Sequence, residues 1–160
     1  MSKQELIRVV LEDCSFERTE ESKNYAPTGM ALNIDRHFTV NLVEGRSTER
    51  ALFVAELRLT VDVVEVDQDG QRTGKVLMIA EAKYGAGYNI SAMSDEDVTH
   101  FFYTHVASKL DTICSGTISD LLSRSGNPPI PYDDHDYYGE MLENERQKAE
   151  ARQRVEFEQA

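Results

Sequence analysis

The sequence has few of the residues and motifs on which metal sites, disulfide frameworks and membrane spans depend. Its only cysteines are Cys14 and Cys114, which lie far apart and form no C-x-x-C pair, and this argues against a zinc site or a disulfide framework. No apolar run approaches the roughly 18 residues of a membrane-spanning helix. Charged residues interrupt the first eight positions, where a signal peptide would be apolar. We therefore expect a cytoplasmic chain that does not insert into membranes.

Positive charge is also scarce. The 17 Lys and Arg residues oppose 29 Asp and Glu residues, which gives a formal net charge of −12 at pH 7, and the excess is spread along the chain. Such a field repels nucleic acids and anionic lipids and favours basic partners. The simpler interpretation, that the charge only keeps the protein in solution, explains the excess equally well.

Common catalytic motifs are missing too. There is no phosphate-binding glycine loop, and neither Ser91 nor Ser119 lies in a G-x-S-x-G context. The run 133–136, Asp-Asp-His-Asp, has metal-binding residue types, but it lacks the spacing of calcium or zinc ligands, so we favour a solvated loop. We expect no catalytic residue, no metal and no cofactor, and an enzyme of unknown type is the less favoured alternative.

The sequence does contain long segments that alternate apolar and polar residues. Such alternation is typical of half-buried strands, and it occurs in residues 6–17, 30–43, 51–66 and 73–90. Asp69-Gly70 predicts a hairpin turn between the last two segments, and Gly85 and Gly87 predict a bend or bulge in the last. In the first segment, strict alternation puts one set of side chains on a single face, opposite Asp13 and Glu17: Leu6, Arg8, Val10, Glu12, Cys14 and Phe16.

The period changes after Ser94, which resembles a helix cap followed by three acidic residues. Apolar residues then recur at spacings of three and four, which predicts a helix of roughly 28 residues that Ser115 and Gly116 could kink. Gly126 and the prolines after it end this helix. Residues 140–160 have good helix formers but a thin apolar face.

Together these segments predict an α+β fold, with a four-stranded antiparallel sheet, a long helix and a second, C-terminal helix. We expect a single domain over residues 1–139 and a charged helix or tail over 140–160. The apolar stripe of the long helix exceeds what one small sheet can cover, so we also expect the chain to form oligomers.

Four motifs, taken in order, resemble the SecB family of export chaperones over about residues 5–130. They are Asp13-Cys14-Ser15-Phe16-Glu17, the L-R-L-T-V of 57–61, the I-A-E-A of 79–82 with the glycines after it, and the helix end at 117–129. The resemblance implies homotetramers, built as dimers of dimers, in which each sheet has a crossover connection and the long helices lie between sheets. It also implies chaperones that hold unfolded, export-bound chains and pass them to the SecA ATPase, without a nucleotide or metal of their own.

Two sets of site residues follow from this resemblance. The family's SecA-facing contacts correspond to Asp13, Glu17, Ile79 and Glu81. The three carboxylates of this set would attract a basic partner; the alternative is a solvated sheet face that blocks aggregation. Client polypeptides would bind exposed apolar surface. For most of the candidates core packing is the alternative role: Phe38, Leu42, Phe53, Tyr84, Tyr88, Met93, Phe101 and Phe102.

The resemblance thus implies an ATP-independent holdase for unfolded or pre-secretory polypeptides. Two stretches, 109–116 and 130–138, depart from the family's pattern. The second interpretation is therefore a SecB-like chaperone dedicated to one client, such as the antitoxin of a toxin–antitoxin system.

Overall fold

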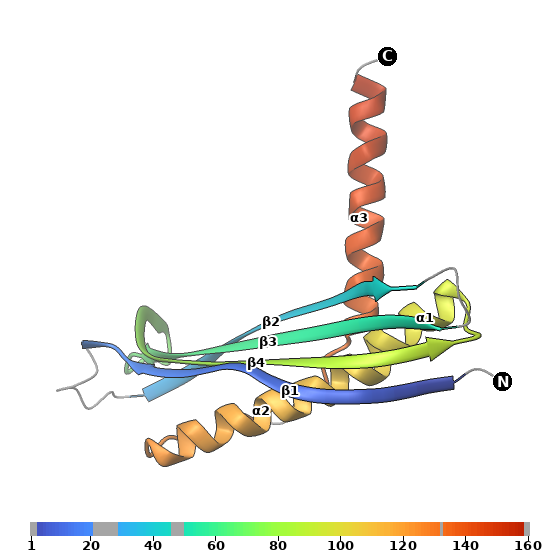
Figure 1. Ribbon diagram of the computed structural model, residues 1–160. Coiled ribbons are helices and arrows are strands. Elements are labelled where there is room, and N and C mark those ends of the chain that lie inside the picture. Colours follow the sequence, from blue (N-terminus) through green and yellow to red (C-terminus); the bar gives the residue numbers. More distant parts are fainter. Residues whose placement is uncertain (1–2, 21–28, 46–49, 132, 159–160) are drawn as a thin grey trace.

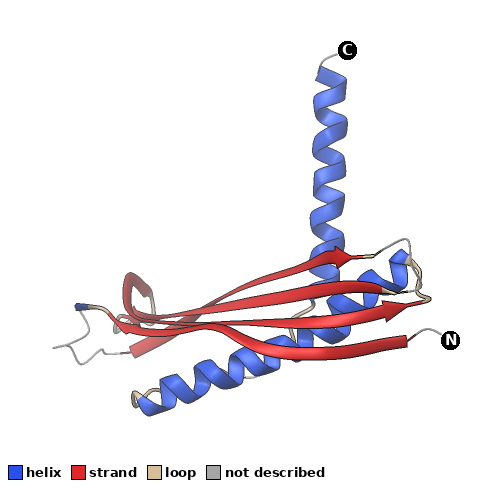
Figure 2. Cartoon of the chain, viewed as in Figure 1, coloured by secondary structure: helices blue, strands red, loops and turns tan. Residues whose placement is uncertain are grey.

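The computed structural model describes residues 3–20, 29–45, 50–131 and 133–158. Four strands precede the helices, as Figures 1 and 2 show. The elements are β1 (Lys3–Arg18), β2 (Gly29–Glu44), β3 (Ala51–Val66), β4 (Arg72–Ser91), α1 (Asp95–Phe101), the π-helical turn η2 (Phe102–Val106), α2 (Ala107–Arg124) and α3 (Tyr137–Glu158). The predicted α+β fold is confirmed. Within the described residues, no helix has the length and apolar character needed to cross a membrane.

The strands form one antiparallel sheet in the order β1-β4-β3-β2. Consecutive strands pair along β2, β3 and β4, but β1 lies beside β4, so the chain crosses from one edge of the sheet to the other between β1 and β2. The predicted turn joins β3 to β4, where Gly70 has a φ of 77° and the Asp67 carboxylate accepts hydrogen bonds from the backbone of Asp69 and Gln71. Strands β1 and β2 are therefore the two edges.

Helix α2 covers one face of the sheet (Figure 1). Its buried positions recur every four residues at Leu110, Cys114, Ile118 and Leu122, and they pack on the buried alternate residues of β3 and β4. Cys114 lies at the centre, where its Sγ donates to two strand carbonyls at 3.7 Å, those of Leu57 and Ala82. Burial, and then the nearby charge of Asp111, raises the pKa of this thiol to about 12, so Cys114 is a packing residue.

The prediction that side chains alternate strictly along β1 was wrong. The register shifts between Leu6 and Arg8 and again between Leu11 and Asp13, so β1 carries two bulges. Each bulge adds one residue and reverses the faces. As a result Arg8 and Val10 pair with glycines on the outer face, away from α2, whereas Cys14 and Phe16 pair with Ala82 and Ala80 on the α2 side.

The glycines of β4 accommodate this irregularity, although the extra residues opposite Gly85 and Gly87 lie in β1 and not, as predicted, at the glycines themselves. A Cβ at Gly85 would collide with the Glu12 carboxylate, and a Cβ at Gly87 would contact Ile7 at 3.8 Å. Gly85 therefore makes room for an acidic side chain to lie across the sheet.

The long helix begins and ends where the sequence predicts. Ser94 caps it by accepting a hydrogen bond from the Asp97 backbone, and Gly126, with a φ of 82°, follows its end. The irregularity lies at η2, however, and not at Ser115 and Gly116, which belong to the continuous α2. The π turn inserts a residue into the helical repeat, and it is the turn that buries Phe102 and Val106.

Helix α3 begins at Tyr137, slightly before the predicted boundary, because Asp136 accepts a hydrogen bond from the Gly139 backbone at 2.9 Å. From there α3 leaves the sheet and stands out from the body (Figure 1). Its first turns contact the rest of the chain: Tyr137 contacts Phe38 and Tyr138 contacts His100, with ring centroids 5.8 and 5.0 Å apart.

Candidate functional site

A groove of about 350 Å³ lies between the edge strand β2, the turn η2 and the base of α3. We call it the β2–α3 groove. Its floor is aromatic, since the Phe38 ring centroid lies 5.2 Å from that of Tyr103 and 5.8 Å from that of Tyr137. Its remaining lining residues, mostly polar or charged, are Arg36, His37, Glu140, Met141, Asn144, Glu145 and Lys148.

Each side of the groove is formed by a different element of the chain. Phe38 pairs with Leu57 and therefore faces the helix side of the sheet, at an edge where no further strand covers it. Tyr103 belongs to the π turn, and Tyr137 is the first residue of α3. The α3 residues that line the groove recur at spacings of three and four, so one face of this helix forms the wall. Leu42 and Val43, 42% and 58% exposed, extend the apolar surface along β2.

The floor of the groove carries no charge. Burial, and then the negative charge of Asp111, raises the pKa of Tyr137, whose hydroxyl is buried. Burial, and then Glu145, raises the pKa of Tyr103. Both phenols stay neutral at physiological pH, so the floor offers an apolar, aromatic surface.

The structure divides the eight predicted client-binding residues into three groups. Phe38 lines the groove and Leu42 is exposed beside it. A separate aromatic cluster, in which Phe53, Tyr88 and Phe102 are buried and Phe101 is partly buried, lies at the start of the long helix. Tyr84 and Met93 are partly buried, and the Tyr84 hydroxyl bonds to Thr117 at 2.9 Å. A client role for these residues stays a prediction.

Sequence analysis missed most of the groove, including Tyr103, Tyr137 and Met141. Tyr103 was overlooked because it lies off the apolar stripe of an ideal helix, and only the π turn explains its position. The other two lie at the start of a helix with a thin apolar face. The tyrosines after the prolines, directly before a helix-forming segment, were the available signal.

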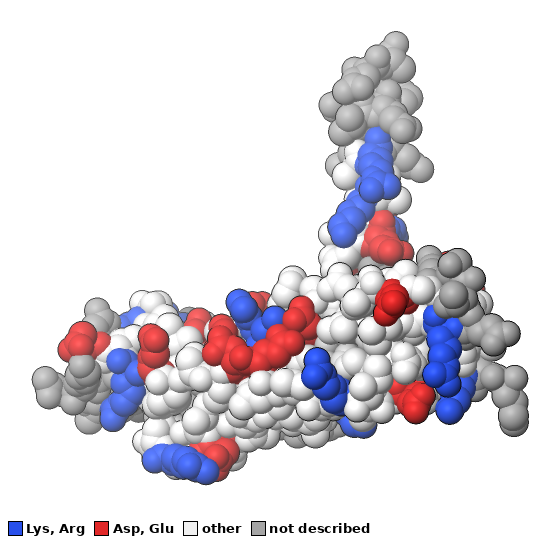
Figure 3. Space-filling model, in the orientation of Figure 1, with Lys and Arg blue, Asp and Glu red and all other residues white. Residues whose placement is uncertain are grey.

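The four residues proposed from the SecB resemblance for partner binding lie together on the outer face of the sheet. Asp13 pairs with Lys83, Glu17 with Ile79, and Ser15 with Glu81, which places the set on two neighbouring strands. We call this region the outer-face acidic patch. Acidic side chains gather over the middle of the sheet in Figure 3.

Most of the cations near this patch are already paired. Lys83 Nζ lies 2.7 Å from Glu12 and 2.8 Å from Glu56, and Arg58 lies 3.7 Å from Glu81. The hydrogen bond from Lys83 lowers the pKa of Glu56, and the bonds to Glu12 and then Glu56 raise the pKa of Lys83. Asp13 and Glu17 are exposed and form no ion pair within the described residues, so their charges are available to a basic partner.

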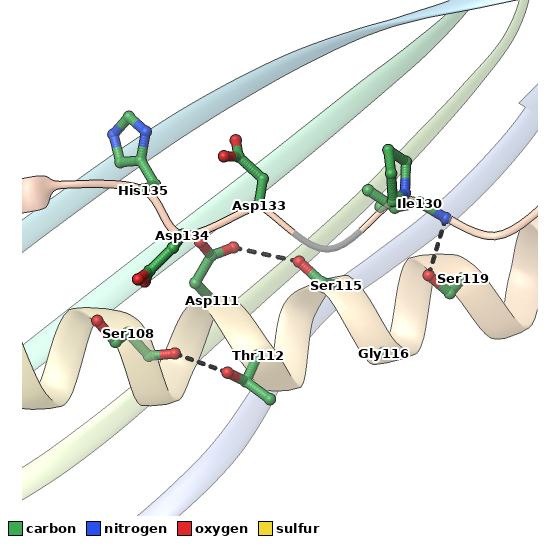
Figure 4. A pocket seen from close by; sticks show the side chains of 11 residues that line it. Ser108, Asp111, Thr112, Ser115, Gly116, Ser119, Ile130, Asp133, Asp134 and His135 are labelled. Carbon is green, nitrogen blue, oxygen red and sulfur yellow. Dashed lines mark hydrogen bonds between the residues drawn. The ribbon is translucent and has the colours of Figure 1, made fainter.

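A smaller pocket of about 180 Å³ lies between α2 and residues 130, 131 and 133–135 (Figure 4). It brings together hydroxyls of α2 and residues of the run 133–136, but three of the four side chains in that run serve different contacts. Asp133 pairs with Arg36, His135 with Glu140, and Asp136 caps α3. The described residues contain no group of three or more His, Cys, Asp or Glu that could hold a metal ion.

No protein-family model and no curated protein matches the chain. Among solved structures it is similar to the Mycobacterium tuberculosis SecB-like chaperone Rv1957, in complex with a ChAD peptide from the Rv1956 HigA1 antitoxin. The identity is 14% and the TM-score 0.60, over 82% of this chain and 90% of that one. A protein of unknown function from Streptococcus agalactiae shares 10% identity with a TM-score of 0.45, over 84% of this chain and 99% of that chain. The first likeness shows that the fold is SecB-like.

Proposed function

We propose that this chain is an ATP-independent holdase chaperone that binds unfolded polypeptide segments in the β2–α3 groove. The observation that carries the proposal is the neutral aromatic floor, open between an edge strand and a projecting helix. The SecB-like fold supports it, because the similar mycobacterial structure is a chaperone with a peptide bound. The proposal assigns no catalytic residue.

The groove suits weak binding of many sequences. Aromatic rings and the flexible Met141 side chain adapt to differently shaped apolar groups. A site of this size accepts two or three apolar side chains, each of which contributes about 1.5–3 kcal/mol on burial. Ordering of the client offsets part of that gain, so we expect a dissociation constant of roughly 10 µM to 1 mM for one groove.

Assembly would raise this affinity by joining several grooves. We propose that chains associate first through β1, an unpaired edge strand with exposed aliphatic side chains, and that the dimers pair to form the expected homotetramer. Those exposed side chains are Leu6, Ile7, Val10 and Leu11. A client that occupies several grooves at once is held far more tightly than by one.

We propose two kinds of client. A general export chaperone would pass its clients to a SecA-type ATPase, and the outer-face acidic patch of Asp13, Glu17, Ile79 and Glu81 is the surface that we propose for this basic partner. A chaperone dedicated to one antitoxin is the second candidate, favoured by the antitoxin peptide in the similar mycobacterial complex.

Two adjacent residues of α3 provide the test of the groove. Met141 lines it, whereas Leu142 does not and is 47% exposed. We expect Met141→Lys to weaken binding of a reduced, unfolded model protein about tenfold, and Leu142→Lys to leave it within about twofold, because only the first puts a charge into the groove. Fluorescence anisotropy of a labelled client measures both. Equal effects, or no binding by the unmodified chain, would contradict the proposal.

A further inference from the structure

A nearly buried arginine connects three parts of the chain at the base of the groove. Arg36 lies on β2, pairs with Leu59 and so points to the helix side of the sheet, where its side chain is 8% exposed. Its Nε lies 3.2 Å from an Asp111 carboxylate oxygen on α2, and a terminal guanidinium nitrogen lies 3.3 Å from Asp133. One side chain therefore bonds to the sheet's covering helix and to the segment that leads into α3.

The two carboxylates differ in their surroundings. The Asp111 side chain is 8% exposed and also accepts a hydrogen bond from Ser115 at 3.2 Å. The Asp133 side chain is 55% exposed and forms an ion pair with Arg36. Asp111 thus fixes the Arg36 guanidinium within the core. Asp133 binds the same guanidinium from the loop, so the loop is held to Arg36.

Arg36 also separates the two cavities. It lines the β2–α3 groove, while Asp111 and Asp133, the two residues that it contacts, line the pocket between α2 and the loop. Figure 4 shows both carboxylates from the pocket side. The ion pairs are consequently part of the wall that the two cavities share.

The position of α3 depends on this region because few contacts hold the helix. Tyr137 and Tyr138 contact neighbouring rings, and His135 lies 2.7 Å from Glu140, but the remaining turns leave the body (Figure 1). Asp133 comes four residues before the helix begins. A shift of the loop there would move the groove wall, since a small rotation at the base is amplified along a projecting helix.

We propose that Arg36 is the positioning residue of the groove: through Asp133 it holds the base of α3, and so sets the width of the client-binding site. This inference rests on the proposed function for its effect on clients, but the position of α3 is measurable without any client. A wall that is fixed before binding loses less freedom when the client arrives, so the ion pair slows client release.

Asp133→Asn is the informative change, because Asp133 is half exposed and its loss leaves the buried pair of Arg36 and Asp111 intact. The matched control is Asp134→Asn, which removes the same charge from the neighbouring exposed residue, a residue that forms no ion pair within the described part of the chain. Asp133→Glu, which keeps the charge, serves as the conservative variant.

The experiment measures the distance between spin labels on cysteines introduced at Asn41 of β2 and Ala151 of α3, in full-length chains with Cys14→Ser, diluted with unlabelled chain. We expect a narrow distribution for the unmodified protein, Asp134→Asn and Asp133→Glu, and a clearly broader one for Asp133→Asn. Dissociation of an unfolded client from Asp133→Asn should be at least threefold faster, with the thermal unfolding midpoint unchanged.

The distance measurement tests whether Arg36 positions α3, and the client-release measurement tests whether the position of α3 sets the binding site. If Asp133→Asn gives the same distance distribution as Asp134→Asn, the positioning role of Arg36 is overturned whether or not clients bind. If the distribution broadens but client release keeps its rate, α3 does not set the site and the inference is overturned as well. If the unmodified chain binds no client, the proposed function fails, while the distances still decide whether Arg36 positions α3.

Discussion

The two edge strands of the sheet leave different surfaces for a partner. Strand β1 carries two bulges and exposed aliphatic side chains. Strand β2 pairs regularly with β3 over most of its length and lies beside η2 and α3, which turn its exposed side into the aromatic groove. Under the proposed function, one sheet offers an edge to a second copy of itself and a groove to a foreign chain.

The largest expected effect on stability in this comparison of the two edges comes from the buried ion pair beneath β2. Asp111→Ala removes the buried partner of Arg36 and leaves the guanidinium with the half-exposed Asp133 alone. A buried charge left without any partner costs about 3–5 kcal/mol, and Asp133 offsets part of that penalty, so we expect a loss of about 2–3 kcal/mol in the free energy of unfolding. Denaturant titration followed by circular dichroism measures it. A loss below about 1 kcal/mol would show that the Arg36 cluster is not needed for the fold.

A pair of variants compares the two edge strands, β1 and β2, directly. Ile7 of β1 and Val43 of β2 are similarly exposed, at 51% and 58%. Ile7→Lys should raise the dissociation constant of the assembly 30- to 100-fold, about 2–3 kcal/mol, because a charge would be buried against the partner strand. Val43→Lys should leave the assembly unchanged. Light scattering over a dilution series distinguishes them, and a strictly monomeric unmodified chain would refute association through β1.

The smallest expected effect concerns the outer face. Charge reversal at Asp13 and Glu17 removes the acidic groups that have no ion pair within the described residues. We expect a roughly three- to tenfold slower association with a basic partner such as a SecA-type ATPase, since exposed charges act mainly on the association rate. Binding in the β2–α3 groove, measured with an unfolded client, should not change. The effect should also disappear at high salt, where surface charges are screened.

The sequence predicted the regular parts of the molecule well. Alternation and helical spacing located the four strands and the long helix, and Ser94 and Gly126 marked its ends, because these patterns follow from burial on one face. The two bulges of β1 were not predicted, since a bulge changes which residues share a face without changing composition.

The site was harder to predict for a similar reason. Phe38 was identified because it belongs to a regular strand. Tyr103 and Tyr137 were not, because a π turn and a helix that begins in a proline-rich loop bring them beside β2. The Arg36 cluster was also missed: its members lie far apart in the chain, and an arginine on the helix side of a strand has no local signal.

The central claim is that unfolded chains lie in the β2–α3 groove, and site-specific photocrosslinking tests it most directly. A photoreactive amino acid would replace Lys148 in the groove wall, Glu17 on the outer face, or Val10 on the β1 edge, each in turn, in the presence of a reduced, unfolded protein. The account predicts that the client is captured from position 148 and hardly at all from positions 17 and 10. Equal capture from all three positions, or capture only away from the groove, would contradict it.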